Sequence, residues 1–147
     1  MRGRLRTTRI LLVEDNPGDA NLVLEVFAEG NVTAAIDHVE DGVEAMAFLR
    51  RQGRHENAKR PDLVLLDLNL PRKDGRWVLK EMKADSNLRS IPVIVLTTSE
   101  AETDINEAYQ NGVNCYLTKP IDFDDFIKLV QVLKDFWLTA AKLATPA

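Results

Sequence analysis

The sequence holds very little cysteine. Cys115 is the single cysteine among 147 residues, so no disulfide can form within the chain. A domain of this length buries enough apolar surface to fold without such crosslinks, and a chain without disulfides suits a reducing compartment. We therefore expect a cytoplasmic protein. Cys115 lies in a stretch that reads as a strand, where a buried, unreactive thiol is expected.

Long apolar runs and a basic excess are also lacking. No apolar stretch approaches the roughly 20 residues of a membrane span, and no signal-peptide core follows the start, so we expect no membrane segment. The net charge of −4 gives no reason to expect nucleic-acid binding, which needs a basic face. The one basic run comprises Arg2, Arg4, Arg6 and Arg9. It predicts a solvated, flexible terminus, with a contact arm for an acidic partner as the alternative.

What is present is the composition of a globular domain, with 45% hydrophobic and 29% charged residues. Internal repeats and low-complexity segments are absent, and the length suits one domain, so we expect a single domain over residues 1–147 with its core at about 8–138. Five short apolar runs stand out: Ile10–Val13, Ile36–Val39, Leu63–Leu66, Val93–Leu96 and Cys115–Leu117. Three of them are nearly continuous in Ile, Leu and Val, which is typical of parallel strands covered on both faces.

Helical spacing of apolar residues fills the intervals between these runs. Helices are predicted after the cap Asn16, around 45–49, around 78–82, over about 102–110, and from the cap Asp122 to about 137. Strands alternating with helices indicate an α/β, flavodoxin-like doubly wound fold, a five-stranded parallel sheet of order 2-1-3-4-5 with five helices. In such sheets the site lies beyond the carboxyl ends of the strands, between the first and third strands.

Polar residues follow the predicted strands at that edge. Glu14 and Asp15 follow the first strand, Asp67 the third, Thr97 and Thr98 the fourth, and Thr118-Lys119-Pro120 the fifth. Crowded carboxylates repel one another unless a cation lies between them. Mg²⁺ takes one or two carboxylates and leaves room for phosphate oxygens. Asp67 is then a candidate nucleophile toward phosphorus, with Mg²⁺, Lys119 and the Thr97 hydroxyl neutralising the phosphoryl oxygens.

With these residues in place, the sequence resembles the receiver domains of two-component response regulators. The matching segments are Val13-Glu14-Asp15, residues 65–75 (LLDLNLPRKDG), Ile91–Thr97 and Tyr116-Leu117-Thr118-Lys119-Pro120. The resemblance covers about residues 8–138. Within the family, the chain looks most like the small single-domain regulators paired with bacterial phytochrome histidine kinases. The extended segment before Pro61 and the Phe136-Trp137-Leu138 ending suggest this placement.

The resemblance implies a role for each matching position. Asp67 would accept a phosphoryl group from a histidine kinase, and Lys119 would bind a phosphoryl oxygen. Glu14, Asp15, Asp67 and the backbone carbonyl of Asn69 would hold Mg²⁺. Thr97 would move toward the phosphoryl group, and Tyr116 would turn inward with it. The resemblance further implies a cis Lys119–Pro120 bond, which many members have.

Two positions depart from the family pattern. Glu14 stands where many members have Asp, so it would reach the metal directly or through a water. Thr98 stands at a position that is often Ala and would alter the access of water, and with it autodephosphorylation. Neither departure predicts a loss of phosphorylation at the site.

The output is expected to be a protein contact. After Trp137 only ten residues remain, too few for an effector domain. We expect a homodimer through the fourth helix, fifth strand and fifth helix. Phe136, Trp137 and Leu138 cannot all face one core, so at least one is expected to face outward. Trp77 is expected to be partly exposed beside the site, as a possible kinase contact.

Two other functions compete with the switch. A Mg²⁺-dependent phosphatase of the haloacid dehalogenase type also uses an Asp nucleophile, but it needs a second Asp two residues later. Here that position is Asn69, which cannot protonate a leaving group. A receiver-like module that binds partners without phosphorylation is the other alternative, although all the expected groups are present. The chain has no glycine-rich phosphate-binding motif, which disfavours a P-loop enzyme.

Overall fold

The structure is a computed structural model that describes residues 7–30 and 33–143. Five parallel strands form one sheet in the order β2-β1-β3-β4-β5. The strands are β1 (Thr8–Val13), β2 (Ala34–Val39), β3 (Leu63–Leu66), β4 (Val93–Thr97) and β5 (Cys115–Thr118). The predicted sheet and its strand order are confirmed. Arg9 lies within β1 rather than in a flexible terminus, whereas the other three arginines of the basic run fall outside the described residues.

Five α-helices alternate with the strands, as the apolar spacing predicts. They are α1 (Pro17–Ala28), α2 (Gly42–Arg50), α3 (Gly75–Ala84), α4 (Glu102–Gln110) and α5 (Phe123–Asp135). The predicted caps form, because the side chains of Asn16 and Asp122 accept hydrogen bonds from the backbone N–H groups of Asp19 and Asp125. Helix α4 differs, since its first flanking residue, Ala101, supplies no side-chain cap.

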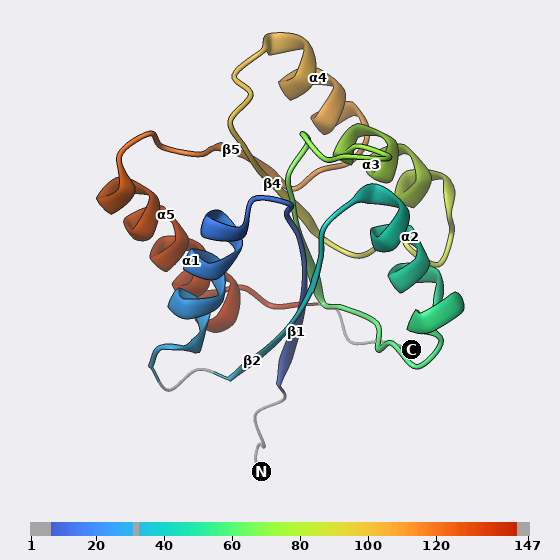
Figure 1. Ribbon diagram of the computed structural model, residues 1–147, viewed down its shortest axis with the longest axis horizontal. Helices are drawn as coiled ribbons and strands as arrows, with labels where there is room; N and C mark the ends of the chain where they lie inside the picture. The colour runs from blue at the N-terminus through green and yellow to red at the C-terminus, as the bar shows by residue number, and fades with distance from the viewer. Residues whose placement is uncertain (1–6, 31–32, 144–147) are drawn as a thin grey trace.

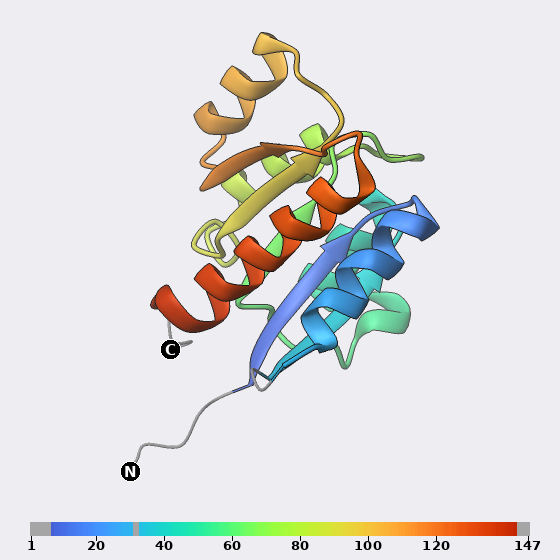
Figure 2. The same cartoon turned by 90° about the vertical axis from the view of Figure 1, so that its left-hand side faces the viewer.

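The helices cover the two faces of the sheet (Figure 1). Helices α1 and α5 lie side by side over one face, as Figure 2 also shows, while α2, α3 and α4 pack against the other. The central strand β3 is buried at all four positions, and its side chains alternate between the two resulting apolar clusters. Full burial of each such side chain contributes about 1.5–3 kcal/mol, so the middle of the sheet is a stable base for the loops at its carboxyl edge.

The segment between α2 and β3 is longer than a simple loop. It contains a short 3₁₀ helix, η1 (Gly53–His55), where the sequence predicts an extended loop. Glu44 of α2 accepts hydrogen bonds from the side chains of Arg54 and His55, the latter at 2.9 Å. The hydrogen bond from His55 is the main reason why the pKa of Glu44 lies below its usual value. This insertion is therefore fastened to α2.

The C-terminal segment continues α5 as a π-helix, η2 (Phe136–Ala140), a few residues beyond the predicted end of the last helix at about 137. Phe136 is 53% exposed, while Trp137 and Leu138 pack against the cluster of α1 and α5. The expectation that at least one of these three side chains faces outward is confirmed.

Two expectations are corrected. Cys115 is half-buried rather than buried, because β5 is an edge strand that is covered less completely than the central ones. The Lys119–Pro120 bond is trans, since the described residues contain no cis peptide. The other residues of that turn keep their predicted place, because β5 delivers Lys119 to the site with its backbone N–H bonded to the Thr97 carbonyl at 2.7 Å.

Candidate functional site

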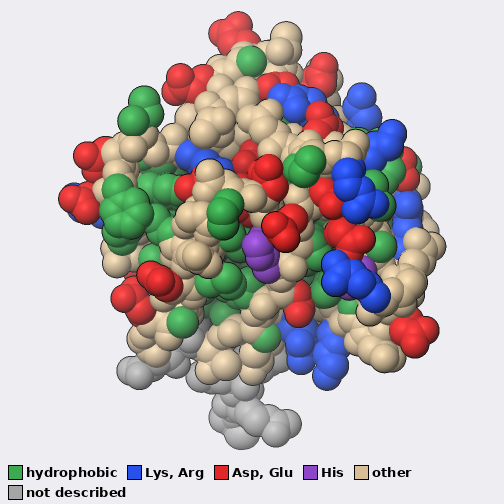
Figure 3. All heavy atoms as spheres, viewed as in Figure 1, with side chains coloured by type: hydrophobic (Ala, Val, Ile, Leu, Met, Phe, Trp, Pro, Cys, Tyr) green, Lys and Arg blue, Asp and Glu red, His purple; other side chains and the backbone are tan. Residues whose placement is uncertain are grey.

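Three carboxylates converge at the carboxyl ends of β1 and β3. Glu14, Asp15 and Asp67 each offer an oxygen, and these oxygens all lie within 4.8 Å of one another. Glu14 and Asp67 are buried, with 4% and 6% of their surface exposed, whereas Asp15 is exposed. Acidic side chains gather near the middle of the face in Figure 3, which looks onto the molecule as Figure 1 does. The predicted cluster therefore forms, with one open side.

Lys119 reaches into this cluster from the end of β5. Its Nζ lies 2.7 Å from Glu14 Oε1, 2.8 Å from Asp19 Oδ2 and 3.0 Å from Asp67 Oδ2. An ammonium group has three N–H donors, so these three carboxylates satisfy it completely. The lysine is buried together with Glu14 and Asp67. The ion pairs fix the distance between the candidate acceptor Asp67 and its counter-charge.

Asp19 is a site residue that the sequence analysis missed. It lies in the first turn of α1, where acidic residues are common because they interact favourably with the helix dipole. That ordinary explanation hides its contact with Lys119, which lies 100 positions away in the chain. The sequence offered one indication: Asp19 lies only a few residues after Glu14 and Asp15, in the helix that starts at this edge of the sheet.

The electrostatics of the cluster favour a bound cation. Burial raises the pKa of Glu14 to about 7, even though Lys119 acts to lower it. Burial works to lower the pKa of Lys119, but its hydrogen bonds to Asp19 and Glu14 outweigh this, and the pKa lies above its usual value. One ammonium group does not balance the surrounding carboxylates. A hard dication with oxygen ligands fits this donor set, because it would stabilise the ionised form of Glu14.

Two hydrogen bonds from backbone N–H groups hold the loop that follows Asp67. The Asn69 backbone N–H donates to Asp67 Oδ1 at 3.0 Å, and the Gly75 N–H donates to the Leu68 carbonyl at 3.0 Å. A Cβ atom on Gly75 would lie 2.3 Å from the Asp67 carbonyl oxygen, so only glycine allows this approach. The β1 side is fastened similarly, since His38 Nε2 lies 2.7 Å from the Glu14 carbonyl oxygen. The role of the Asn69 carbonyl as a metal ligand stays a prediction.

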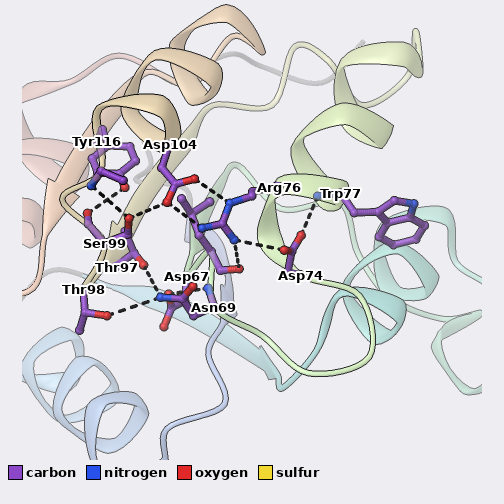
Figure 4. Close-up of polar contacts among 12 residues, drawn as sticks. Asp67, Asn69, Asp74, Arg76, Trp77, Thr97, Thr98, Ser99, Asp104 and Tyr116 are labelled. Carbon is purple, nitrogen blue, oxygen red and sulfur yellow. Dashed lines mark hydrogen bonds and ion pairs between the residues drawn. The ribbon is translucent and has the colours of Figure 1, made fainter.

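Thr97 and Tyr116 lie on the β4–β5 side of the site (Figure 4). Thr97 is fully buried, and the Asn69 side-chain amide lies 3.5 Å from its hydroxyl and 3.5 Å from that of Thr98. Tyr116 is half-buried on β5, and its hydroxyl donates to the Ser99 carbonyl at 2.9 Å. Burial raises the pKa of this hydroxyl. Both residues thus stand where the sequence places them, next to the loop between β4 and α4.

Trp77 stands on the first turn of α3 and is partly exposed, as expected. Its backbone N–H is capped by Asp74, and Lys73 Nζ lies 5.6 Å from the centre of its ring. Figure 4 shows the ring pointing away from the polar network of the site. A kinase contact at Trp77 stays a prediction.

The comparison with known families decides the assignment. The model of the response regulator receiver domain matches residues 10–131, which is most of the chain. This chain is a response regulator receiver domain. Receiver domains are signalling switches of two-component systems that bind Mg²⁺ and take their signal from a sensor kinase. The carboxylates, Lys119 and Thr97 lie together at the carboxyl edge of this receiver fold, and their individual roles stay predictions.

Individual relatives agree with the family match. The chain is 51% identical over 138 residues to the response regulator Rcp1 of Synechocystis sp., with 91% of each chain covered. The structure of the Mn²⁺-bound form of Rcp1 superimposes with a TM-score of 0.92 at 48% identity, over 94% of this chain and 99% of that one. A phosphorylated cyanobacterial phytochrome response regulator, RcpA, gives a TM-score of 0.92 at 48% identity, over 95% and 100%.

None of the helices in the described part of the chain combines the length and the apolar character that crossing a bilayer requires.

Proposed function

We propose that this receiver domain accepts a phosphoryl group on Asp67 from the phosphohistidine of a sensor histidine kinase. The observation that carries the proposal is Lys119 Nζ at 3.0 Å from Asp67 Oδ2, inside a buried acidic cluster. A buried lysine so placed supplies a fixed positive charge for a phosphoryl oxygen. The domain acts as a cytoplasmic switch and catalyses only its own phosphorylation and dephosphorylation.

Phosphoryl transfer requires in-line approach and neutralisation of the phosphoryl oxygens. An Asp67 carboxylate oxygen attacks phosphorus, and the P–N bond to the kinase histidine breaks. The electron pair stays on the imidazole nitrogen, which takes up a proton. Lys119 donates to one phosphoryl oxygen, and Thr97 offers its hydroxyl to another after moving toward the group.

Glu14, Asp15, Asp67 and the Asn69 carbonyl are the proposed Mg²⁺ ligands. The bound cation supplies charge neutralisation for the phosphoryl oxygens and for the carboxylates around them. Glu14 already accepts a hydrogen bond from the Asn16 N–H at 3.1 Å. That contact orients its carboxylate toward the cluster, for binding directly or through a water. The Mn²⁺-bound form of the related Rcp1 supports a divalent cation in this family.

The kinase partner is proposed to be of the bacterial phytochrome type. The support is the similarity to RcpA, described as a cyanobacterial phytochrome response regulator, at 48% identity. Phosphorylation adds charge to the site and biases the arrangement of Thr97 and Tyr116, which pass the change to the surface. The output is a contact with a downstream protein, and no nucleic-acid or membrane contact is proposed.

A homodimer through α4, β5 and α5 is part of the proposal. Tyr109 of α4 is 50% exposed, and Val132 and Phe136 at the C-terminal half of α5 and in η2 are 64% and 53% exposed. Apolar side chains that are left in water favour an interface.

The intact mass of the protein after incubation with acetyl phosphate and Mg²⁺ tests the function. We expect one added phosphoryl group, absent from Asp67→Asn and from a metal-free sample. Asp37→Asn is the matched control, because Asp37 is exposed on β2 and is not an acceptor in this mechanism; that variant should still gain the group.

The outcomes separate the alternatives. An adduct that persists in Asp67→Asn would move the acceptor to another residue. No adduct in the parent protein, together with no beryllofluoride complex, would favour a module that binds partners without phosphorylation.

A further inference from the structure

Arg76 joins the acceptor loop to helix α4. Its guanidinium makes a bidentate interaction with the Asp104 carboxylate, from Nε to Oδ1 at 2.8 Å and from Nη2 to Oδ2 at 2.7 Å. Its remaining nitrogen, Nη1, donates to Asp74 Oδ2 at 3.1 Å and faces the Leu68 carbonyl oxygen at 3.4 Å. Leu68 directly follows the acceptor Asp67. Figure 4 shows Arg76 between these groups. One side chain therefore contacts α3, α4 and the loop that carries Asp67.

Helix α4 has few other attachments. Ala108 is its only buried residue, and Ala101 gives no side-chain cap at its start. Asp104 also accepts a hydrogen bond from the Ser99 hydroxyl at 2.6 Å, and that hydroxyl accepts one from the Ala101 N–H at 3.3 Å. The first turn of α4 and the loop before it are thus held mainly through Asp104. Elements with little apolar burial are the ones whose position changes most easily.

Ser99 is the link to the switch residues. Its carbonyl accepts the hydrogen bond from the Tyr116 hydroxyl, and it lies two residues after Thr97 on the same backbone. The position of Ser99 therefore decides whether Tyr116 finds its acceptor in this orientation. An unbroken series of contacts runs from Leu68 through Arg76, Asp104 and Ser99 to Tyr116.

The ion pair is stronger than an ordinary surface pair. The side chains of Arg76 and Asp104 are 32% and 15% exposed, and the bidentate geometry adds directionality to the charge. The hydrogen bonds from Arg76 are the main cause that lowers the pKa of Asp104 to about 2. The pair is therefore intact throughout the range of neutral pH.

We propose that Arg76 and Asp104 are positioning residues of the phosphorylation switch, which hold Ser99 so that Tyr116 is turned inward before any phosphoryl group arrives. This proposal rests on the proposed function. A domain already in the receptive arrangement reacts faster, because the apparent affinity for the phosphodonor is proportional to the fraction of molecules that is competent to bind it. The pair thus sets how readily Asp67 is phosphorylated, although neither residue touches the phosphoryl group.

The test measures the rate of Asp67 phosphorylation by acetyl phosphate, from intact mass, alongside the thermal midpoint. Arg76→Gln and Asp104→Asn should each slow the reaction by about fivefold. The double variant should be no slower than the slower single one, because the two residues act as one unit. Asp104→Glu keeps a carboxylate and should recover part of the rate.

Two further variants distinguish positioning from simple stabilisation. Glu81→Gln breaks the Arg50–Glu81 ion pair (3.0 Å), which lies on the side of α3 that faces away from α4. Arg50 is 32% exposed, as is Arg76. This variant should leave the phosphorylation rate unchanged. In a Tyr116→Phe background the Tyr116–Ser99 bond is already lost, so Asp104→Asn should cause no additional slowing.

Three results would overturn the proposal. One is a lower thermal midpoint with an unchanged phosphorylation rate in Arg76→Gln and Asp104→Asn, which would make the pair only structural. Another is an equal slowing by Asp104→Asn with and without the Tyr116 hydroxyl. No phosphorylation of the parent protein would overturn the proposed function itself, and the positioning role with it.

Discussion

At the scale of single residues, the balance of charge around Lys119 governs the site. Glu14, Asp19 and Asp67 each accept one of its N–H groups. In the proposed function, a phosphoryl group on Asp67 would bring new oxygens that compete for the same donors. Asp19 is the partner nearest to solvent, with a side chain that is 27% exposed, compared with 4% for Glu14 and 7% for Asp67. It therefore adds negative charge on the solvent side of the site, from which a phosphodonor would approach.

Asp19→Asn should speed phosphorylation by acetyl phosphate. The change removes one negative charge that repels an incoming dianion and frees part of the Lys119 charge for the phosphoryl group. We expect a rate increase of about threefold at low ionic strength, which shrinks as salt screens the interaction. Rates from intact mass at two salt concentrations measure it.

Glu25→Gln is the matched control for Asp19→Asn. Glu25 is an exposed residue of the same helix, α1, and its replacement changes the net charge equally. An equal acceleration in this control would show that only overall charge matters. A slower reaction in Asp19→Asn would instead mean that Asp19 is needed to orient Lys119.

At the scale of elements, a buried lysine joins α5 to α1. Lys134 is 9% exposed, and its Nζ donates to the carbonyl oxygens of Val26 at 3.1 Å and Glu29 at 2.6 Å. The last carbonyl groups of a helix have no partner within the helix. A cation at that end also interacts favourably with the helix dipole. Lys134 therefore completes the C-terminal end of α1 from a distant part of the chain.

Lys134→Met should lower the free energy of unfolding by about 2 kcal/mol. The methionine keeps most of the apolar stem but leaves the two carbonyl groups without their donor. Urea denaturation followed by circular dichroism measures the change. Lys128→Met, at an exposed position of the same helix, should change stability by less than about 0.5 kcal/mol. Equal effects of the two substitutions would contradict a stabilising role for the hydrogen bonds from Lys134 to α1.

Sequence patterns predict local elements well and their distant contacts poorly. The caps Asn16 and Asp122 and the strand Leu63–Leu66 follow from neighbouring residues, and all three are confirmed. Lys134 bonds to a carbonyl 108 positions away, and nothing near it in the chain signals a buried cation. The same reason explains why Asp19 was missed. Its role depends on how α1 and β5 meet at the edge of the sheet.

At the scale of the whole molecule, the sheet order decides where the site forms. The carboxyl ends of β1 and β3 lie side by side because these strands are neighbours in the sheet, with β2 and β4 on their outer sides. The alternation of strands and helices predicts this order. The predicted acidic cluster at this edge therefore follows from topology together with three carboxylate positions. The surface of the proposed dimer could not be predicted in the same way, because which apolar side chains are exposed depends on how each helix is rotated against the sheet.

Light scattering tests the proposed dimer through α4, β5 and α5. We expect a mass of two chains for the parent protein and one chain for Val132→Asp/Phe136→Asp, because two charges would be placed in the interface. Phe123→Ser is the control, since Phe123 is 66% exposed on the same helix but lines a cavity against α1. The parent protein remaining a monomer with and without phosphorylation would refute the dimer.

The hydroxyl of Tyr109 accepts a hydrogen bond from the Tyr116 backbone N–H at 3.1 Å, on the outer side of the edge strand β5. An uncovered edge is a template on which a strand of another chain can add, and this is a common start of aggregation. Here a side chain of the protein itself takes the place of the intruding carbonyl group. Because this backbone donor is already occupied, the addition of a strand from another chain at this edge is less favourable.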